Sequence, residues 1–353
     1  MQEPGAGAPD SPSQISSTPS RLRLWWQRFG WMLRWGGTLI GVLYVMRLID
    51  MASLRSAFSH ASAWTLVAAL AVVAAGQVLG AARWRILLAA YGAVALPRLS
   101  QAVRLYFIAV FYNTYLPGGV AGDIVRGVVT RDAFAGSGAT EALAVVLVER
   151  ALGLLGVFAL VAVGLALVGS ALADTGALWV WSAAGGAGAV ALVLALPLAR
   201  SVARFLPGRL AAVARRLPVV SLPLQFALAV VLSLGTQLAV AVCGFLLLRD
   251  FYPATTFADA LFIVPLAAAT IYLPITVGGT GAREAVFITL CGKVLGMPSH
   301  DALAASLLLW FTSLVAGAVG GVLQLLSRHQ MPPASAAAPA LAPPATDAGQ
   351  RPR

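Results

Sequence analysis

Long apolar runs alternate along this chain with short segments that carry its charged residues. A helix that crosses a membrane core of roughly 30 Å needs about 20 apolar residues. Charge-free runs of this length predict membrane spans at Ala61–Ala82, Ala151–Ala173, Thr175–Ala199, Leu217–Leu248 and Ala302–Ser327. The second of these is expected to begin earlier, near Glu141. The pattern therefore predicts an all-α polytopic membrane protein.

A shorter apolar run, Trp35–Met46, follows four arginines. It fits either the core of a signal peptide or a first span. Because no small-residue cleavage site follows it, we expect an uncleaved span, which brings the predicted number of transmembrane helices to about six.

The distribution of arginine predicts the side that each loop faces, because basic loops stay in the cytoplasm. Loops 83–104 and 200–216 contain arginines and no acidic residue, so both are expected on the cytoplasmic side. Counting spans back from the second loop places residues 121–140 there as well. The stretch 105–120 must then enter the membrane and return on the same side.

The same count predicts a second re-entrant segment within residues 260–300 and places both termini in the cytoplasm. One alternative stays open here: Ala260–Ala282 is long enough to span the membrane outright.

Both predicted re-entrant segments contain Tyr-Leu-Pro, then a glycine pair and a further glycine, then charged residues. Proline removes a backbone donor and glycine permits turns, so both segments are expected to be broken helices. The predicted break positions are Pro117, Gly118, Gly119, Gly122, Pro274, Gly278, Gly279 and Gly281. Each half then has three spans and one broken hairpin, and an odd number of spans inverts the second half. This is typical of inverted-repeat transporters, although a chance match between two Pro-Gly breaks is the alternative.

The residues that could bind a ligand are the charged residues predicted to lie at membrane depth. Glu149 and Arg150 lie inside the predicted span that closes the first repeat. Adjacent helical residues point about 100° apart, so each of the two needs a partner elsewhere. The candidates are Asp123, Arg126, Arg283 and Glu284, at the ends of the breaks. Such a network either pins the hairpins to the bundle or leaves an arginine free to bind a lipid phosphate.

Arg83, Trp84 and Arg85 follow the first long span. Arginine and tryptophan at such a position can bind phosphates, but they are more typical of an interfacial anchor, which is what we expect here.

Composition narrows the functional classes. Of 353 residues, 59% are hydrophobic and 10% are charged, which excludes a water-soluble fold. The net charge of +11 is spread between apolar runs and not along one face, so no nucleic-acid partner is expected. Two cysteines and three histidines give no pattern for a metal site, and no cofactor is expected.

The ends of the chain differ from its middle. Residues 1–30 and 328–353 are rich in small residues and proline and are predicted to be disordered, the former in the cytoplasm. The predicted membrane domain covers 31–327, with repeats at 31–173 and 174–327.

These motifs, in this order, resemble the flippase-like family built on the transmembrane region of lysylphosphatidylglycerol synthases. The matching positions are Arg83-Trp84-Arg85, Tyr106, Asn113, Leu116-Pro117-Gly118-Gly119, Gly122-Asp123, Arg126, Glu149-Arg150, Leu273-Pro274 and Gly278 to Glu284. The resemblance implies an integral protein of the bacterial plasma (inner) membrane that moves lipids between leaflets.

The resemblance also implies a lipid-handling site. Its residues in this chain are Asn113, Asp123, Arg126, Glu149, Arg150, Arg283 and Glu284. No soluble synthase domain follows Ser327, so tRNA-dependent synthase activity is not expected. The leading hypothesis is a non-enzymatic flippase or transporter that binds an anionic or aminoacylated lipid head group in a central cavity.

Two alternatives remain at this point. The chain is either an enzyme that modifies lipids or lipid-linked sugars, or a membrane subunit that docks a partner synthase or glycosyltransferase. The identity of the lipid and the oligomeric state are left undecided by the sequence.

Overall fold

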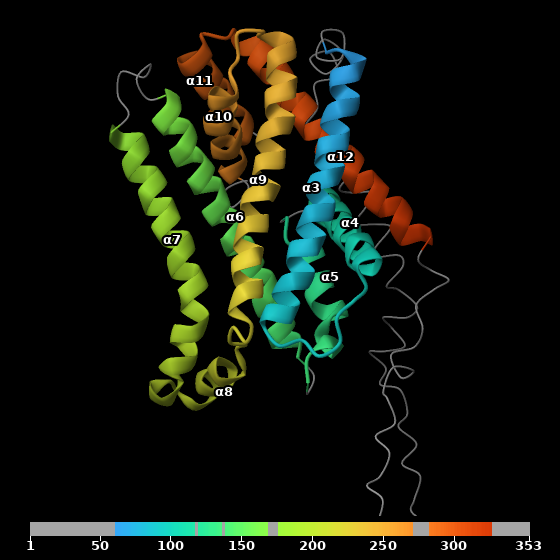
Figure 1. The fold of residues 1–353 in the computed structure, drawn as a ribbon, viewed down its shortest axis with the longest axis vertical. Coiled ribbons are helices and arrows are strands. Elements are labelled where there is room, and N and C mark those ends of the chain that lie inside the picture. Colours follow the sequence, from blue (N-terminus) through green and yellow to red (C-terminus); the bar gives the residue numbers. More distant parts are fainter. Residues whose placement is uncertain (1–60, 117–118, 136–137, 169–175, 271–281, 327–353) are drawn as a thin grey trace, which may run out of the picture. The chain divides into compact units, whose positions relative to one another are not determined.

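Every element described in this computed structural model is helical. The structure describes residues 61–116, 119–135, 138–168, 176–270 and 282–326. Within those ranges the helices are α3 (Ala63–Ala90), α4 (Leu99–Tyr115), α5 (Ala121–Val129), α6 (Ala139–Val168), α7 (Gly176–Ser201), α8 (Gly208–Arg216), α9 (Pro223–Phe251), α10 (Phe257–Ala269), α11 (Ala282–Leu295) and α12 (Ser299–Leu326), with 3-10 turns at Arg131–Ala133 and Ala203–Phe205. The predicted all-α class is confirmed (Figure 1).

Five of these helices are long and apolar enough to cross a membrane: α3, α6, α7, α9 and α12. They correspond to the five long spans predicted from the sequence, and they establish a membrane protein. Their outer faces expose large apolar side chains, such as Trp181 on α7 at 73% and Leu224 on α9 at 83%. Exposed residues of this kind suit contact with lipid tails. The predicted first span, Trp35–Met46, lies outside the described residues, as do both termini.

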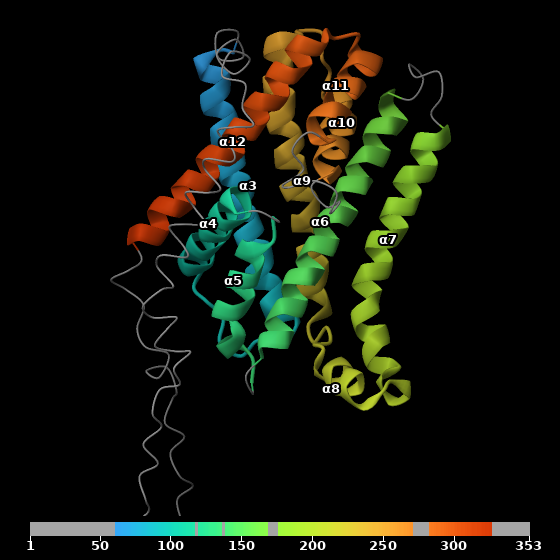
Figure 2. The same ribbon diagram turned by 180° about the vertical axis from the view of Figure 1, so that it is seen from behind.

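Helices α3 and α9 lie side by side in opposite directions (Figures 1 and 2). At one end, the Ser62 amide and the Thr65 hydroxyl donate to Asp250, at 2.8 and 2.9 Å. At the other end, the Ser221 amide donates to the Ala90 carbonyl at 2.7 Å. These contacts fix the register of the two helices over their whole length.

The helix is interrupted in the region of the first predicted break, while the predicted re-entrant hairpin stays a prediction. Helix α4 ends at Tyr115 and α5 begins at Ala121, and the two pack against each other. Gly119 has a φ of +61°, a conformation that glycine adopts at little cost. A Cβ on Gly122 would lie 1.9 Å from the Ala109 carbonyl oxygen, so glycine here lets the two helices approach closely. Pro117 and Gly118 lie outside the described residues.

The second predicted break falls mostly outside the described residues, because 271–281 includes Pro274, Gly278, Gly279 and Gly281. Helix α10 has 13 residues and is therefore about 20 Å long, short of a roughly 30 Å core. Its start is fixed by Thr256, whose hydroxyl accepts from the Asp259 amide, while the Asp259 carboxylate accepts from the Thr256 amide. Helix α11 packs against α10.

Three loops meet at the end of the bundle where α3 finishes. The amides of Val94 and Ala95 donate to the Ala133 carbonyl at 2.8 and 3.2 Å, so the loop after α3 touches the loop before α6. The contact between Ser221 and Ala90 brings the loop before α9 to the same end. The stretch containing α4 and α5 thus starts and finishes at one end, as predicted; its entry into a bilayer stays a prediction.

The short helix pairs contact the long helices reciprocally. Helix α4 packs against α12, while α10 packs against α6 (Figure 2). Glycines make both contacts close: a Cβ on Gly320 of α12 would lie 1.9 Å from the Phe107 carbonyl oxygen, and one on Gly164 of α6 would lie 2.5 Å from the Phe262 nitrogen. In an inverted repeat, a contact from the first half to the second is matched by an equivalent contact from the second half to the first. These two contacts fit that pattern, while the repeat itself stays a prediction.

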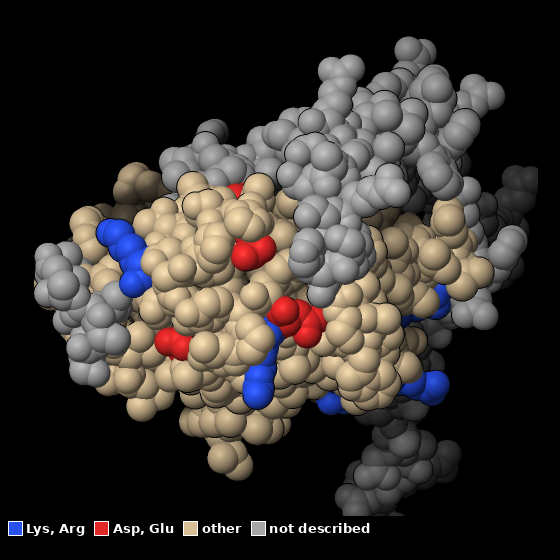
Figure 3. Space-filling model, turned by 90° about the horizontal axis from the view of Figure 1, so that it is seen from above, with Lys and Arg blue, Asp and Glu red and all other residues tan. Residues whose placement is uncertain are grey.

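The opposite end of the bundle, where α9 finishes and α12 begins, is shown in Figure 3. Its described surface is mostly neutral, with separate acidic and basic side chains and no gathered basic patch. The end with the three loops differs, since several exposed arginines lie on it. They include Arg98, Arg131, Arg200, Arg204 and Arg215.

Candidate functional site

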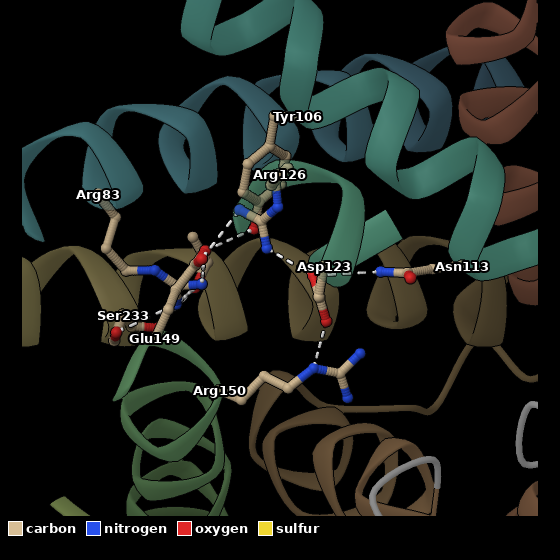
Figure 4. A network of polar contacts seen from close by, with 9 residues as sticks. Arg83, Tyr106, Asn113, Asp123, Arg126, Glu149, Arg150 and Ser233 are labelled. Carbon is tan, nitrogen blue, oxygen red and sulfur yellow. Dashed lines mark hydrogen bonds and ion pairs between the residues drawn. The ribbon is translucent and has the colours of Figure 1, made fainter. Parts of the chain in front are cut away.

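Five charged side chains from three helices meet inside the bundle, and we call them the charged cluster (Figure 4). They are Arg83 of α3, Asp123 and Arg126 of α5, and Glu149 and Arg150 of α6. The break after α4 turns the chain so that α5 can place two charges against α6. The cluster thus joins the first broken hairpin to two of the long helices.

Glu149 is the most deeply buried member, with 2% of its surface exposed. Its Oε1 accepts from Nη2 of Arg83 at 2.8 Å and from the Tyr106 hydroxyl at 3.1 Å. Its Oε2 accepts from Nη1 of Arg126 at 2.9 Å. A buried carboxylate is tolerated when charged donors satisfy its oxygens, and here two arginines do so.

Arg126 contacts two carboxylates and two aromatic rings. Its Nη2 donates to Oδ1 of Asp123 at 2.6 Å, in addition to the contact of Nη1 with Glu149. Its guanidinium carbon lies 5.0 Å from the ring centre of Trp84 and 4.6 Å from that of Tyr106. Cation–π contacts of this kind are strongest where water is excluded, so Arg126 is fixed between two rings and two carboxylates.

Arg150 is the least enclosed of the three arginines. Its Nε donates to Oδ2 of Asp123, and its Nη2 donates to the Gly119 carbonyl. Its side chain is 28% exposed, against 7% for Arg83 and 5% for Arg126. Arg150, on α6, therefore contacts both α5 and Gly119 in the segment between α4 and α5.

The sequence predicted that Glu149 and Arg150 would need separate partners, and the structure confirms this. Glu149 pairs with Arg126 and Arg150 pairs with Asp123, both of which were among the expected candidates. The cluster carries three positive and two negative side chains, a formal charge of +1. Within the cluster the surplus charge is not matched by a carboxylate.

The prediction that Arg83 and Trp84 form an interfacial anchor is wrong. Arg83 is 6% exposed and Trp84 is fully buried, and Arg83 also donates to the hydroxyls of Ser233 and Thr236, each at 3.1 Å. The physical reason is that α3 continues to Ala90, so Arg83 lies roughly 10 Å before the helix end. Arg85 points elsewhere and donates to the Pro97 carbonyl at 2.8 Å.

Asn113 connects the two helices of the first hairpin. Its Oδ1 accepts from the Gly122 amide at 2.8 Å, and its Nδ2 lies 3.4 Å from Oδ1 of Asp123. It thereby satisfies a backbone donor in the first turn of α5. Its expected contact with a ligand stays a prediction.

Arg283 and Glu284 lie in the first turn of α11 and form an ion pair with each other. Arg283 is buried and Glu284 is largely so. Their predicted role at a lipid site stays a prediction.

Sequence reasoning missed Arg83, Trp84, Ser233 and Thr236 as parts of the site. One signal was available: Ser233 and Thr236 are three residues apart in an apolar span, so they lie on one helix face.

Among the described residues, no group of three or more His, Cys, Asp or Glu side chains is arranged to hold a metal ion. The cluster is thus a set of arginines and carboxylates, a chemistry suited to binding charged groups.

Comparison with known proteins gives one family. No curated protein matches the chain. The family described as the lysylphosphatidylglycerol synthase TM region matches residues 34–321, a range that contains the whole charged cluster. It describes a membrane region and not the catalytic synthase domain. With most of its length matched, the chain belongs to the lysylphosphatidylglycerol synthase TM region family.

Proposed function

We propose that this protein is a flippase or transporter that binds an anionic or aminoacylated lipid head group at the charged cluster and moves it between leaflets. The proposal rests on one observation: five charged side chains lie together among membrane-crossing helices, with one positive charge in surplus. A guanidinium at membrane depth is a suitable partner for a lipid phosphate.

In this proposal the carboxylates of the cluster hold the arginines in place and do not act as a general base. In support of this role, Asp123 and Glu149 both accept hydrogen bonds from arginines on each of their oxygens. A partner synthase or glycosyltransferase is compatible with transport and stays a prediction.

We place the three-loop end of the bundle in the cytoplasm of a bacterial cell, in its plasma membrane, with both termini on that side. The exposed arginines at this end support the orientation, because basic loops are retained in the cytoplasm.

Reconstitution tests the function. Purified protein in liposomes should move lipids whose acyl chains carry a fluorophore, measured by quenching the outer leaflet with dithionite. Arg150→Ala, alone or with Arg126→Ala, should lower the initial rate by about tenfold, the effect of losing a charged hydrogen bond. Arg85→Gln, on α3 but outside the cluster, is the matched control. Equal rates with protein-free liposomes would exclude a flippase.

A further inference from the structure

Every carboxylate oxygen of the cluster already accepts at least one hydrogen bond from a neighbouring side chain, and both carboxylates are buried. On Glu149, Oε1 accepts from Arg83 and Tyr106, and Oε2 accepts from Arg126. To bind an ammonium at Glu149, a ligand would have to displace a buried arginine, which would leave that charge without its partner.

Asp123 is occupied in the same way. Its Oδ1 accepts from Arg126 at 2.6 Å and from the Asn113 amide, and its Oδ2 accepts from Arg150. Each of the four carboxylate oxygens thus has at least one donor. The amino group of an aminoacylated head group would meet only carboxylates that already pair with arginines, and it would lie next to a surplus positive charge.

Donor capacity, in contrast, remains at Arg150. Among the residues that the structure describes, no acceptor contacts its Nη1, and its Nη2 donates only to the Gly119 carbonyl. Figure 4 shows this end of the guanidinium directed away from Asp123. Two adjacent nitrogens match the two unbridged oxygens of a phosphodiester.

Charge balance points to the same ligand. Three arginines share two carboxylates, so the cluster keeps one positive charge, and Arg150 is its most exposed member at 28%. A phosphodiester carries one negative charge and would bring the cluster to neutrality. A lysyl ester of that phosphodiester carries a net positive charge and would raise the positive charge instead.

We infer that the site selects a monoanionic phosphodiester head group without an amino group, and that Arg150 determines this specificity. The inference rests on the proposed function and deepens it. The proposed function allows either an anionic or an aminoacylated lipid, and the inference selects the anionic one. The same chemistry occurs in a lipid such as phosphatidylglycerol and in its water-soluble head group.

Binding and transport are measured separately. Titration calorimetry of the full chain in dodecyl maltoside compares dihexanoyl phosphatidylglycerol, its lysyl ester and dihexanoyl phosphatidylcholine. Phosphatidylglycerol should bind about tenfold more tightly than either of the others, the effect of one charged contact. In liposomes, the rates for long-chain versions of the three lipids should follow the same order.

Two variants at one position test the role of Arg150. Arg150→Gln should reduce the ratio of phosphatidylglycerol to lysyl-ester affinity to near one, and Arg150→Lys, which keeps the charge but loses the paired donors, should give an intermediate ratio. Arg85→Gln should leave the ratio unchanged. The thermal unfolding midpoint of each variant shows whether the variant is folded. If Arg150→Gln does not fold, Arg150→Lys alone tests the inference.

The outcomes separate the two proposals. Selective binding without movement would overturn the flippase but support the head-group inference. Equal or tighter binding of the lysyl ester, or selectivity that survives in both Arg150 variants, would overturn the inference even if lipids move. Soluble glycerophosphoglycerol that binds as tightly as the lipid would support the head-group inference and would show that the acyl chains do not contribute to binding.

Discussion

Glu149 shows why the charged cluster is an interdependent unit at the scale of single residues. A carboxylate with 2% exposure is stable only while charged donors surround it, and its donors come from α3, α4 and α5. Removing one donor therefore affects the packing of several helices. Arg83 is the most informative donor, because it is the one that connects the cluster to α9.

Arg83→Gln should lower the free energy of unfolding by about 3 kcal/mol, since it removes one partner of a buried ion pair. Arg85→Gln, two residues away, removes a single bond to the Pro97 carbonyl and should cost only about 1 kcal/mol. Both are measured by titrating the protein from mild detergent into dodecyl sulfate. Equal losses for the two variants would contradict the structural role given to Arg83.

The charges of this site were predictable in part from single residues. Glu149 and Arg150 are adjacent, and helical geometry alone required different partners for them. Arg83 was not predictable in this way, because a charge was taken to mark the end of a span. In the structure the hydroxyls of α9 and the carboxylate of α6 satisfy this arginine inside the helix, and such tertiary contacts leave no mark in the local pattern.

At the scale of elements, the first hairpin depends on close contact between α4 and α5. Gly122 faces the backbone of Ala109, and Asn113 on α4 accepts a hydrogen bond from the Gly122 amide. The contact is between backbones, so side-chain rearrangement cannot make room for a larger residue.

Gly122→Ala should therefore force the two helices apart. A new Cβ would lie 1.9 Å from the Ala109 carbonyl oxygen, and overpacking of this kind costs roughly 1–3 kcal/mol. Gly188→Ala is the matched control on α7, where a Cβ would meet nothing within 4 Å and alanine favours the helix. Hydrogen exchange across 121–129 should accelerate in Gly122→Ala alone. Unchanged exchange together with unchanged stability would show that the hairpin tolerates the wider spacing.

The first interruption and five of the spans were predictable because each depends on local composition. Tyr115-Leu-Pro-Gly indicated an interruption close to where α4 ends, and apolar runs located five spans. The ends of the long helices were less predictable: α3 runs eight residues beyond its charge-free segment, which ends at Ala82. The short helix α8 was not expected, since its nine residues include three arginines that read as a loop.

At the scale of the whole molecule, the loops define two chemically different ends. The hydrogen bonds from Val94 to Ala133 and from Ser221 to Ala90 gather three loops at one end, where exposed arginines also lie. The loop between α9 and α10 lies at the other end, because α9 runs the full length of α3 in the opposite direction. This arrangement needs no assumption about the residues outside the described ranges.

Single-cysteine labelling tests this arrangement in a membrane. The native cysteines, Cys243 and Cys291, are buried and can be replaced by alanine. New cysteines at the exposed positions Ala95, Ala135 and Leu210 should react with an impermeant maleimide in inverted vesicles, whereas Ala254→Cys should react in right-side-out vesicles. The physical reason is the retention of arginine-rich loops in the cytoplasm. If each of the four cysteines reacted in the opposite type of vesicle from the one expected, only the proposed cytoplasmic orientation of the three-loop end would be contradicted. Reaction of Ala95→Cys and Ala135→Cys from opposite sides would contradict the re-entrant path of α4 and α5, and with it the position of the charged cluster within the membrane.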